Sequence, residues 1–213
     1  MSEPRVVLLD EETVAGISTL AQWPELALAS RRRGDREELD DLGAILHAIR
    51  NHEHPATSAR GTVVTVMSTS AKAGKTTLVA SLARALSSLT SQTVAVVDLC
   101  EQGGGAGASL AMSPCAGLMA LARQLDRAEK PDLATLLAPH SAGVFLIAAA
   151  ADSPASSEDT SKVISALAET VDFVIVDTPL SLDHGVIAAL EASTLILILT
   201  SVPQREGGAL GDD

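Results

Sequence analysis

The hydrophobic positions of this chain form two alternating patterns from residue 62 onward. Short runs such as "TVVTVMS" (62–68) and "TVAVVDL" (93–99) are almost wholly apolar and rich in β-branched residues. Such runs predict strands that are buried on both faces of a sheet. Between them, "TTLVASLARALSSL" (76–89) carries apolar residues at helical spacing, so a helix is expected to follow the first strand.

The same alternation continues through the rest of the chain. Further strands are predicted at 143–150, 171–179 and 194–201, and further helices at 115–128, 131–139, 157–170 and 183–192. Strands that alternate with helices and are apolar throughout predict an α/β fold. The expected architecture is a doubly wound, mostly parallel sheet with helices on both faces.

The first sixty residues have a weaker pattern. They are interpreted as two strands at 5–9 and 25–29 and two helices at 12–22 and 36–50. The polar segment "NHEHPATSARG" then contains proline and glycine, which favours a linker. Its histidines lack partners with metal-ligand spacing and are interpreted as solvated. We therefore expect a short βα module at 1–50, a linker at 51–61 and a larger α/β domain at 62–213.

Charge and composition argue against several classes of function. The formal net charge is -12, so nucleic-acid binding through general electrostatic attraction is not expected. One basic run, 31–36, is followed at once by acidic residues and is interpreted as a solvated helix start. No apolar run has the length of a membrane span, no signal peptide is recognised, and the two cysteines form no disulfide or metal pattern. A soluble, cytoplasmic protein is expected.

The segment "STSAKAGKTTL" (68–78) lies between the first predicted strand and its helix. A P-loop has the pattern G-x-x-x-x-G-K-[ST] in this context, and its backbone N–H groups hold phosphates. Gly74, Lys75 and Thr76 fit the pattern, but Thr69 occupies the first glycine position. The alternative is a helix start with an incidental GKTT. The predicted nucleotide-binding residues are Ser70, Ala71, Lys72, Ala73, Gly74, Lys75, Thr76 and Thr77.

Two acidic residues end predicted strands. Asp98 follows the four apolar residues that begin "VAVVDL". Asp177 follows the four apolar residues of "FVIVD", which is the form of a Walker B motif. Ligands of parallel α/β sheets bind at the carboxyl ends of strands, and carboxylates at that edge hold Mg²⁺ in P-loop proteins. We predict Lys75, Asp98 and Asp177 as catalytic residues, and Thr76, Asp98 and Asp177 as the Mg²⁺ site. A strand-end aspartate that only caps the following turn is the alternative for each acid.

These motifs together resemble a known family. "GKTTLVASLARAL", "VAVVDL" and "VDFVIVDTP" resemble the deviant-Walker P-loop ATPases that include ParA and MinD, and most of all the CpaE/TadZ branch of Tad/Flp pilus assembly. The resemblance covers about 62–203. It implies a P-loop NTPase fold of the SIMIBI, MinD-like type, binding of ATP with Mg²⁺, and a dimer formed around ATP in the cytoplasm. It also implies protein partners in a pilus, secretion or localisation machine, and an N-terminal module similar to a shortened receiver domain.

Three departures from the family pattern weaken the case for hydrolysis. The signature lysine that reaches the partner's phosphates aligns with Ser70, while Lys72 lies two residues away. The acid expected to orient the attacking water is replaced by Cys100, and Glu101 follows it out of phase. The chain also ends soon after residue 203, where relatives continue. Binding of ATP with slow hydrolysis is therefore expected.

Other classes remain as alternatives. The first is a non-enzymatic localisation scaffold with a vestigial nucleotide site, and the second is a chromosome or plasmid partition ATPase, which the acidic charge disfavours. A membrane-targeted MinD-like role is disfavoured because no basic amphipathic helix follows residue 204. Bacterial tyrosine kinases share the scaffold, but this chain has no tyrosine to autophosphorylate. The positions of Cys100 and Cys115 do not match the cluster ligands of a nitrogenase reductase.

Overall fold

The computed structural model describes residues 27–31, 60–71, 73–90, 92–100, 105–127, 133, 143–150 and 155–201. Its strands are β1 (Ala27–Arg31), β2 (Thr62–Ser68), β3 (Val94–Asp98), β4 (Ala116–Gly117), β5 (Val144–Ala148), β6 (Phe173–Asp177) and β7 (Leu195–Ser201). Its helices are α2 (Lys75–Thr90), α3 (Ala106–Leu110), α4 (Leu118–Arg127), α6 (Ser157–Ala168) and α7 (His184–Ala192). The predicted alternation of strand and helix is thus confirmed in this part of the chain.

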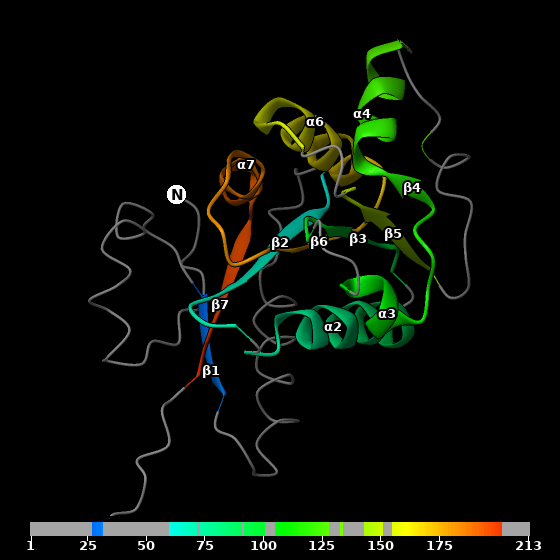
Figure 1. The fold of residues 1–213 in the computed structure, drawn as a ribbon. Helices are drawn as coiled ribbons and strands as arrows, with labels where there is room; N and C mark the ends of the chain where they lie inside the picture. The colour runs from blue at the N-terminus through cyan, green and yellow to red at the C-terminus, as the bar shows by residue number, and fades with distance from the viewer. Residues whose placement is uncertain are drawn as a thin grey trace, which may run out of the picture.

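The strands form one sheet in the order β1-β7-β2-β6-β3-β5-β4, and every pair in it is parallel. Figure 1 shows the sheet edge-on between two layers of helices. A parallel sheet covered on both sides is what near-continuous apolar strands require, because neither face can meet water. The predicted α/β doubly wound sheet is confirmed.

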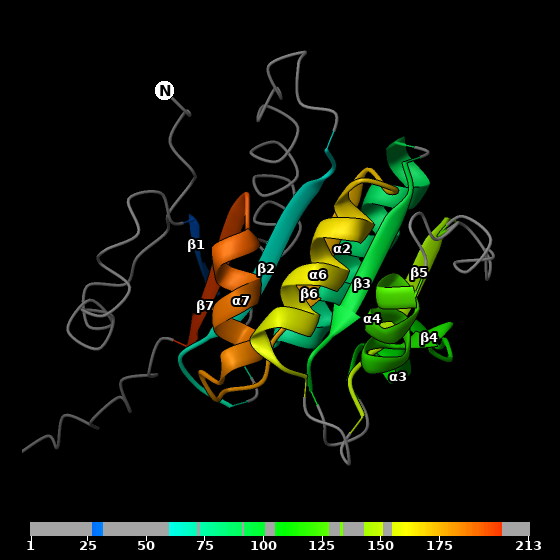
Figure 2. The ribbon, with the colours of Figure 1, turned by 90° about the horizontal axis from the view of Figure 1, so that it is seen from above.

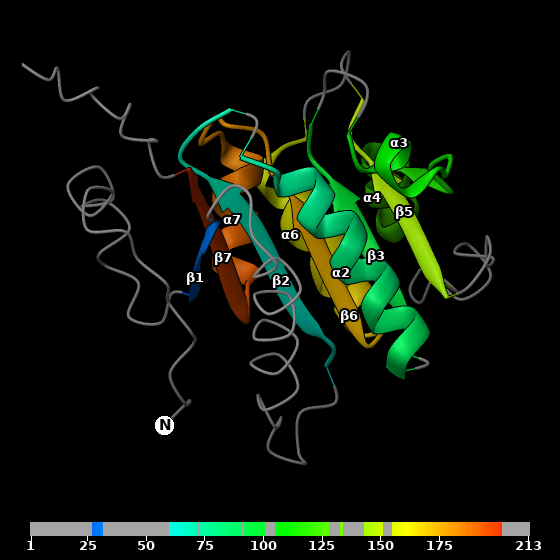
Figure 3. The same ribbon diagram turned by 90° about the horizontal axis from the view of Figure 1, so that it is seen from below.

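Alternate residues of the strands face opposite helical layers. On one face, residues such as Val63, Val97 and Val174 pack with α4, α6 and α7, which lie together over the sheet in Figure 2. On the other face, residues such as Val64 and Val96 pack with α2 and α3; Figure 3 shows α2 lying along the strands on this side of the sheet. Side chains of a strand alternate between faces, so each apolar run supplies both cores.

Two helices of the first layer begin at side-chain caps. Ser156 accepts a hydrogen bond from the backbone N–H of Asp159 at the start of α6, and Asp183 accepts one from Val186 at the start of α7. Capping satisfies backbone N–H donors that the helix itself leaves without partners. The acidic residues in the first turn of α6 also interact favourably with the positive end of the helix dipole. No described helix combines the length and hydropathy needed to cross a membrane.

The strand near the N-terminus differs from expectation. It was predicted at 25–29 in a separate module, but it lies at Ala27–Arg31 and forms an edge of the main sheet. Its residues pair in parallel with β7, from Ala27 beside Leu197 onward. Arg31, expected at a helix start, therefore ends a strand. The other predicted elements of 1–50, the linker histidines and residues 51–59 lie outside the described residues, so the division at 51–61 stays a prediction.

The segment after β3 also differs from expectation. Helix α3 was not predicted, and the helix expected from residue 115 begins only at Leu118. Cys115 instead lies against the sheet, where its backbone N–H and its thiol both donate to the carbonyl of Leu146. This contact leads into the short strand β4, which extends the sheet beyond β5. The helix predicted at 131–139 lies outside the described residues except for Leu133.

We expect the substitution Gly61→Ala to destabilise the fold. A Cβ at Gly61, just before β2, would lie 2.1 Å from the carbonyl oxygen of Val171, and backbone cannot move aside cheaply. Overpacking of this kind costs about 1–3 kcal/mol or more. Chemical denaturation would measure the loss. Gly117→Ala is the matched control, because the nearest atoms to its Cβ would be 4.0 Å away; equal stability of the two variants would contradict the prediction.

Candidate nucleotide-binding site

The predicted functional residues meet at the carboxyl ends of three neighbouring strands. β2 runs into the loop that leads to α2, while Asp98 is the last residue of β3 and Asp177 is the last residue of β6. The two aspartates are paired in register across the adjacent strands. The sequence-based expectation that both acids end strands at one edge of the sheet is therefore confirmed.

The loop before α2 bends sharply at one glycine. Gly74 has φ of 92°, a backbone conformation that glycine adopts without a steric penalty. Ala111 is the one non-glycine residue with positive φ in the part of the chain that the structure describes. Thr69, in the position of the first motif glycine, therefore needs no strained conformation. The loop departs from the P-loop pattern without backbone strain at that position.

Lys75 lies at the start of α2 and contacts the loop that precedes it. Its ammonium donates a hydrogen bond to the Ser68 hydroxyl at 3.0 Å, and this hydroxyl donates to the Ser70 carbonyl at 2.8 Å. Ser68 is the buried last residue of β2, so it ties the lysine to the sheet. Sequence analysis missed this role of Ser68, although its place at a strand end before the loop was a usable signal.

Asp98 has the contacts of a capping residue. Its Oδ1 accepts from the Cys100 backbone N–H at 2.9 Å, and its Oδ2 accepts from the Ala106 N–H at 2.7 Å, at the start of α3. A Cβ at Gly105 would come within 2.0 Å of Oδ2, so only glycine permits this approach. Asp98 thus holds Gly105 and the start of α3 against β3, a role for Gly105 that the sequence did not reveal.

Asp177 is in a different condition from Asp98. It is fully buried, and no described group donates a hydrogen bond to either of its oxygens. Burial raises the pKa of Asp177 to about 6, and Asp98 adds to the rise; Lys75 lowers it, as does the Thr76 hydroxyl, which lies near the carboxylate but outside good hydrogen-bond geometry. A buried carboxylate without donors is costly unless a cation compensates it. Asp177 with Thr76 nearby therefore fits a Mg²⁺ site built of hard oxygen ligands.

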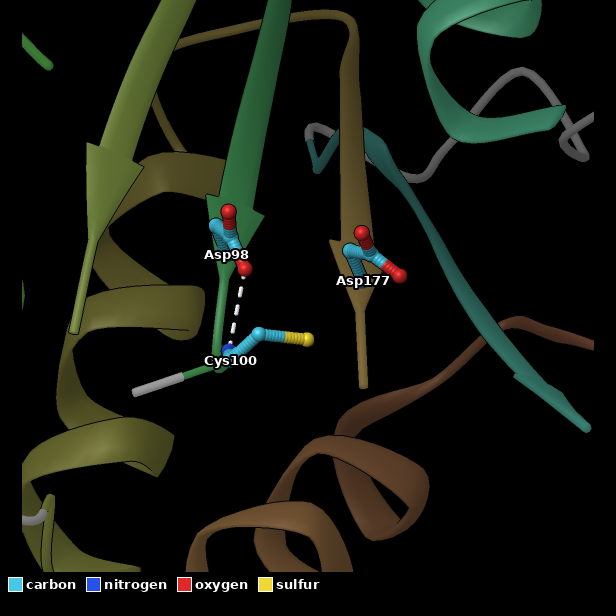
Figure 4. A group of neighbouring side chains, drawn as sticks. All are labelled: Asp98, Cys100 and Asp177. Atoms are coloured by element: carbon cyan, nitrogen blue, oxygen red, sulfur yellow. Dashed lines mark hydrogen bonds between the residues drawn. The ribbon is translucent and has the colours of Figure 1, made fainter. Parts of the chain in front are cut away.

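Cys100 faces the two carboxylates. Figure 4 shows its side chain extending toward Asp177 while its backbone N–H binds Asp98. Burial raises the pKa of Cys100 to about 12; Asp177 and Asp98 raise it further than Lys75 lowers it. The thiol is therefore protonated at neutral pH, and it is a poor acceptor for the proton of an attacking water. Both cysteines are free.

The structure brings together most of the predicted site. Lys75, Thr76 and Asp98 lie close enough to Asp177 or Cys100 to influence their pKa values. Ala73 is buried in the core on the α2 side of the sheet, while Ala71 and Thr77 are exposed. Lys72 and Glu101 lie outside the described residues, so the substitution of Lys72 for the signature lysine stays a hypothesis.

Solved structures share this architecture. The chain is similar to a ParA-family ATPase from Chlorobium tepidum, with 26% identity and a TM-score of 0.59 over 66% of this chain and 60% of that one. It is similar to a cobyrinic acid a,c-diamide synthase from Mycobacterium smegmatis with bound ADP and magnesium, with 24% identity and a TM-score of 0.50 over 65% and 58% of the two chains. It is also similar to the kinase domain of the Escherichia coli tyrosine kinase ETK, with 16% identity and a TM-score of 0.51 over 82% and 80%.

The chain has the fold of the ParA/MinD-type P-loop ATPases. It spans 60% of the length of the ParA-family protein and 58% of the diamide synthase. The likeness to the synthase and to the kinase is one of fold alone. No protein-family model matches the chain, and no curated protein matches it either.

Proposed function

We propose that this chain is a ParA/MinD-like ATP-binding protein that acts in the cytoplasm, uses Mg²⁺, hydrolyses ATP slowly and positions or regulates a larger assembly. The observation that carries the proposal is Asp177, a buried carboxylate without hydrogen-bond donors among the described residues, beside Thr76 and the loop lysine. A P-loop ATPase needs a compensating cation at this place. The similarity to a ParA-family ATPase supports it.

The loop and the start of α2 would bind the phosphates. Backbone N–H groups at a helix N-terminus favour anions, and no acidic residue in the first turn of α2 opposes them. Lys75 uses its ammonium on one neutral hydroxyl, that of Ser68, and an ammonium has three N–H donors. It therefore keeps donors for the β- and γ-phosphate oxygens.

Thr76, Asp98 and Asp177 would hold Mg²⁺. When bound, this ion supplies positive charge that screens the phosphates and polarises the γ-phosphoryl group. Asp98 contributes from a fixed position, because two backbone N–H groups orient its carboxylate. Asp177 contributes a carboxylate whose oxygens have no hydrogen-bond partner among the described residues.

Cys100 is the reason to expect slow hydrolysis. It occupies the position where the resemblance expects an acid that orients the attacking water, and burial together with both aspartates raises its pKa to about 12. A neutral thiol neither attracts a proton nor fixes a water as a carboxylate does. Bound ATP would then stay unhydrolysed for a long time, which suits a protein that positions a larger assembly.

The larger assembly is proposed to be a Tad/Flp-type pilus or secretion machine, and the proposed form of the chain in it is a homodimer. The support is the resemblance of "VVDL", the glycine-rich segment and "VDFVIVDTPLSLDHGVIAALEAS" to the CpaE/TadZ branch. Leu180 and Leu182, which follow Asp177 by three and five residues, are 51% and 54% exposed. Apolar side chains beside a nucleotide site suit contact with a protein partner.

The second candidate function is a localisation scaffold without enzyme activity. It is favoured by the contacts of Asp98, whose two oxygens already serve as backbone caps, and by the thiol at the position of the catalytic acid. A partition ATPase remains a further alternative, which the ParA-family likeness supports and the net charge of -12 opposes.

Calorimetric titration of the purified chain with ATP and ADP, in Mg²⁺ and in EDTA, tests the proposal. We expect both nucleotides to bind in Mg²⁺ and ATP binding to weaken at least about tenfold in EDTA, since one charged contact contributes about 1.5–3 kcal/mol. Phosphate release should be slower than about 1 per second, the lower end of ordinary turnover. An absence of binding at millimolar ATP would favour the scaffold, and ordinary turnover would contradict slow hydrolysis.

A further inference from the structure

Three side chains of different chemistry converge between β3 and β6. Asp98, Cys100 and Asp177 each offer one donor atom, and the three atoms all lie within 4.8 Å of one another. Figure 4 shows the thiol between the ends of the two strands. The two aspartates are buried and Cys100 is half-buried. A thiol beside two carboxylates is an unusual group to bury, because each carboxylate disfavours ionisation of the other donors.

A second observation indicates that this group is built for a cation. Both oxygens of Asp177 lack a hydrogen-bond partner among the described residues although the side chain is fully buried. Asp98, in contrast, is fixed by the N–H groups of Cys100 and Ala106. The N–H of Cys100 that binds Asp98 also fixes the backbone from which the thiol projects. The hydrogen bond between Cys100 and Asp98 thus fixes two of the three metal-ligand candidates relative to each other.

The nature of the donors determines which cation fits. Mg²⁺ prefers an octahedral shell of oxygens, and sulfur is a poor ligand for it. Zn²⁺ and similar ions such as Co²⁺ and Cd²⁺ bind both thiolate and carboxylate ligands. In catalytic zinc sites the protein supplies three ligands and the fourth position is open to water or substrate. Zn–S and Zn–O distances of about 2.3 and 2.1 Å place tetrahedral donors about 3.5 Å apart. The three donors lie within 4.8 Å of one another, so they need to close by up to about 1.3 Å to reach these distances.

We propose that Asp98, Cys100 and Asp177 bind a sulfur-preferring divalent cation of the Zn²⁺ class in the absence of nucleotide. Binding replaces the thiol proton by the metal, and the proton passes to solvent. No oxidation or reduction is involved. Because the two carboxylates are those proposed for Mg²⁺, the two ions exclude each other, and a Zn²⁺-class ion blocks the Mg²⁺ site. All three donors belong to the nucleotide-free chain, so the site does not depend on the proposed ATPase function.

The test uses the full chain without nucleotide, reduced with a phosphine that does not supply thiols, and titrated with Cd²⁺ or Co²⁺ alone. A bound thiolate gives a sulfur-to-metal charge-transfer band, which reports ligation by cysteine directly. Zn²⁺ is then measured by competition against the Co²⁺ complex. We expect one equivalent to bind, the band to saturate at that point, and excess Mg²⁺ to displace the ion poorly.

Variants identify the ligands. Cys100→Ser should abolish the band and weaken binding at least about 10- to 100-fold, the loss that even an outer partner of a metal ligand causes. Asp177→Asn should weaken binding while keeping a band at high metal concentration. Cys115→Ser is the matched control, since its thiol donates to the Leu146 carbonyl at another part of the sheet, and it should bind like the parent.

The outcomes separate this inference from the proposed function. A parent chain without a charge-transfer band, or a band that survives in Cys100→Ser and vanishes in Cys115→Ser, overturns the metal site. If Cys100→Ser does not fold, as judged by circular dichroism, Cys100→Ala and Asp177→Asn carry the same test. A chain that binds Cd²⁺ but not ATP refutes the ATPase proposal alone, and a chain that binds Mg²⁺-ATP but not Cd²⁺ refutes this inference alone.

Discussion

Replacement of Lys75 by alanine is expected to weaken ATP binding by about a hundredfold or more while the fold stays intact. Each charged contact to a phosphate contributes about 1.5–3 kcal/mol, and the substitution removes two. Within the described part of the chain Lys75 makes one hydrogen bond, to Ser68, so its loss disturbs little packing. Calorimetric titration in Mg²⁺ measures the affinity, and circular dichroism reports the fold.

Two lysine variants serve as controls. Lys162→Ala removes a surface ion pair between Lys162 on α6 and Asp126 on α4 and should leave the affinity for ATP unchanged. Lys72→Ala is informative in another way: if this lysine has taken the signature role, ATP still binds but dimerisation and turnover collapse, and if it has not, both persist. ATP affinity equal to that of the parent in Lys75→Ala would show that "AKAGKTT" is only a helix start.

Asp177→Asn is expected to stabilise the nucleotide-free protein at neutral pH and to remove the Mg²⁺ dependence of ATP binding. Burial raises the pKa of Asp177 from 3.8 to about 6, so the folded state holds this proton more tightly than the unfolded chain. Its contribution to stability is full below about pH 4 and is lost as the pH rises through 6. A rise of two pKa units corresponds to about 3 kcal/mol at pH 7. This value is an upper limit for the increase in unfolding free energy that Asp177→Asn produces.

Urea denaturation between pH 4 and pH 7 measures this effect. The unfolding free energies of the parent and of Asp177→Asn should diverge as the pH rises from 4 to 6 and stay apart above it. Asp126→Asn, which removes an exposed carboxylate, should follow the parent. Parallel curves for the parent and Asp177→Asn at all pH values would mean that Asp177 is compensated in a way the described contacts do not include.

Much of this site could be predicted because its signals are local. An apolar run that ends in an acid marks a strand whose last residue lies at the ligand-binding edge, and this rule located both Asp98 and Asp177. Gly74, Lys75 and Thr76 were recognisable from spacing alone. The α/β class followed from the alternation of two periodicities, which the parallel sheet then confirmed.

The rest depended on contacts between distant residues. Asp98 was predicted as a ligand, but its hydrogen bond to the N–H of Ala106 depends on the close approach of Gly105, which no spacing rule indicates. The lack of donors around Asp177 is a property of its packed surroundings. The strand at Ala27–Arg31 was expected in a separate module because its partner, β7, lies at the far end of the chain.

The sheet order has a consequence for how the protein folds during synthesis. β2 carries the phosphate-binding loop, yet its two neighbours are β6 and β7, which begin at residues 173 and 195. Pairings between segments so far apart in sequence form slowly, because the chain between them must first lose entropy. During synthesis on the ribosome, β2 and its loop therefore remain unpaired with β6 and β7 until most of the chain has emerged. After β1, the strand that carries the phosphate-binding loop is the first of this sheet to be translated, yet its pairing is among the last to be completed.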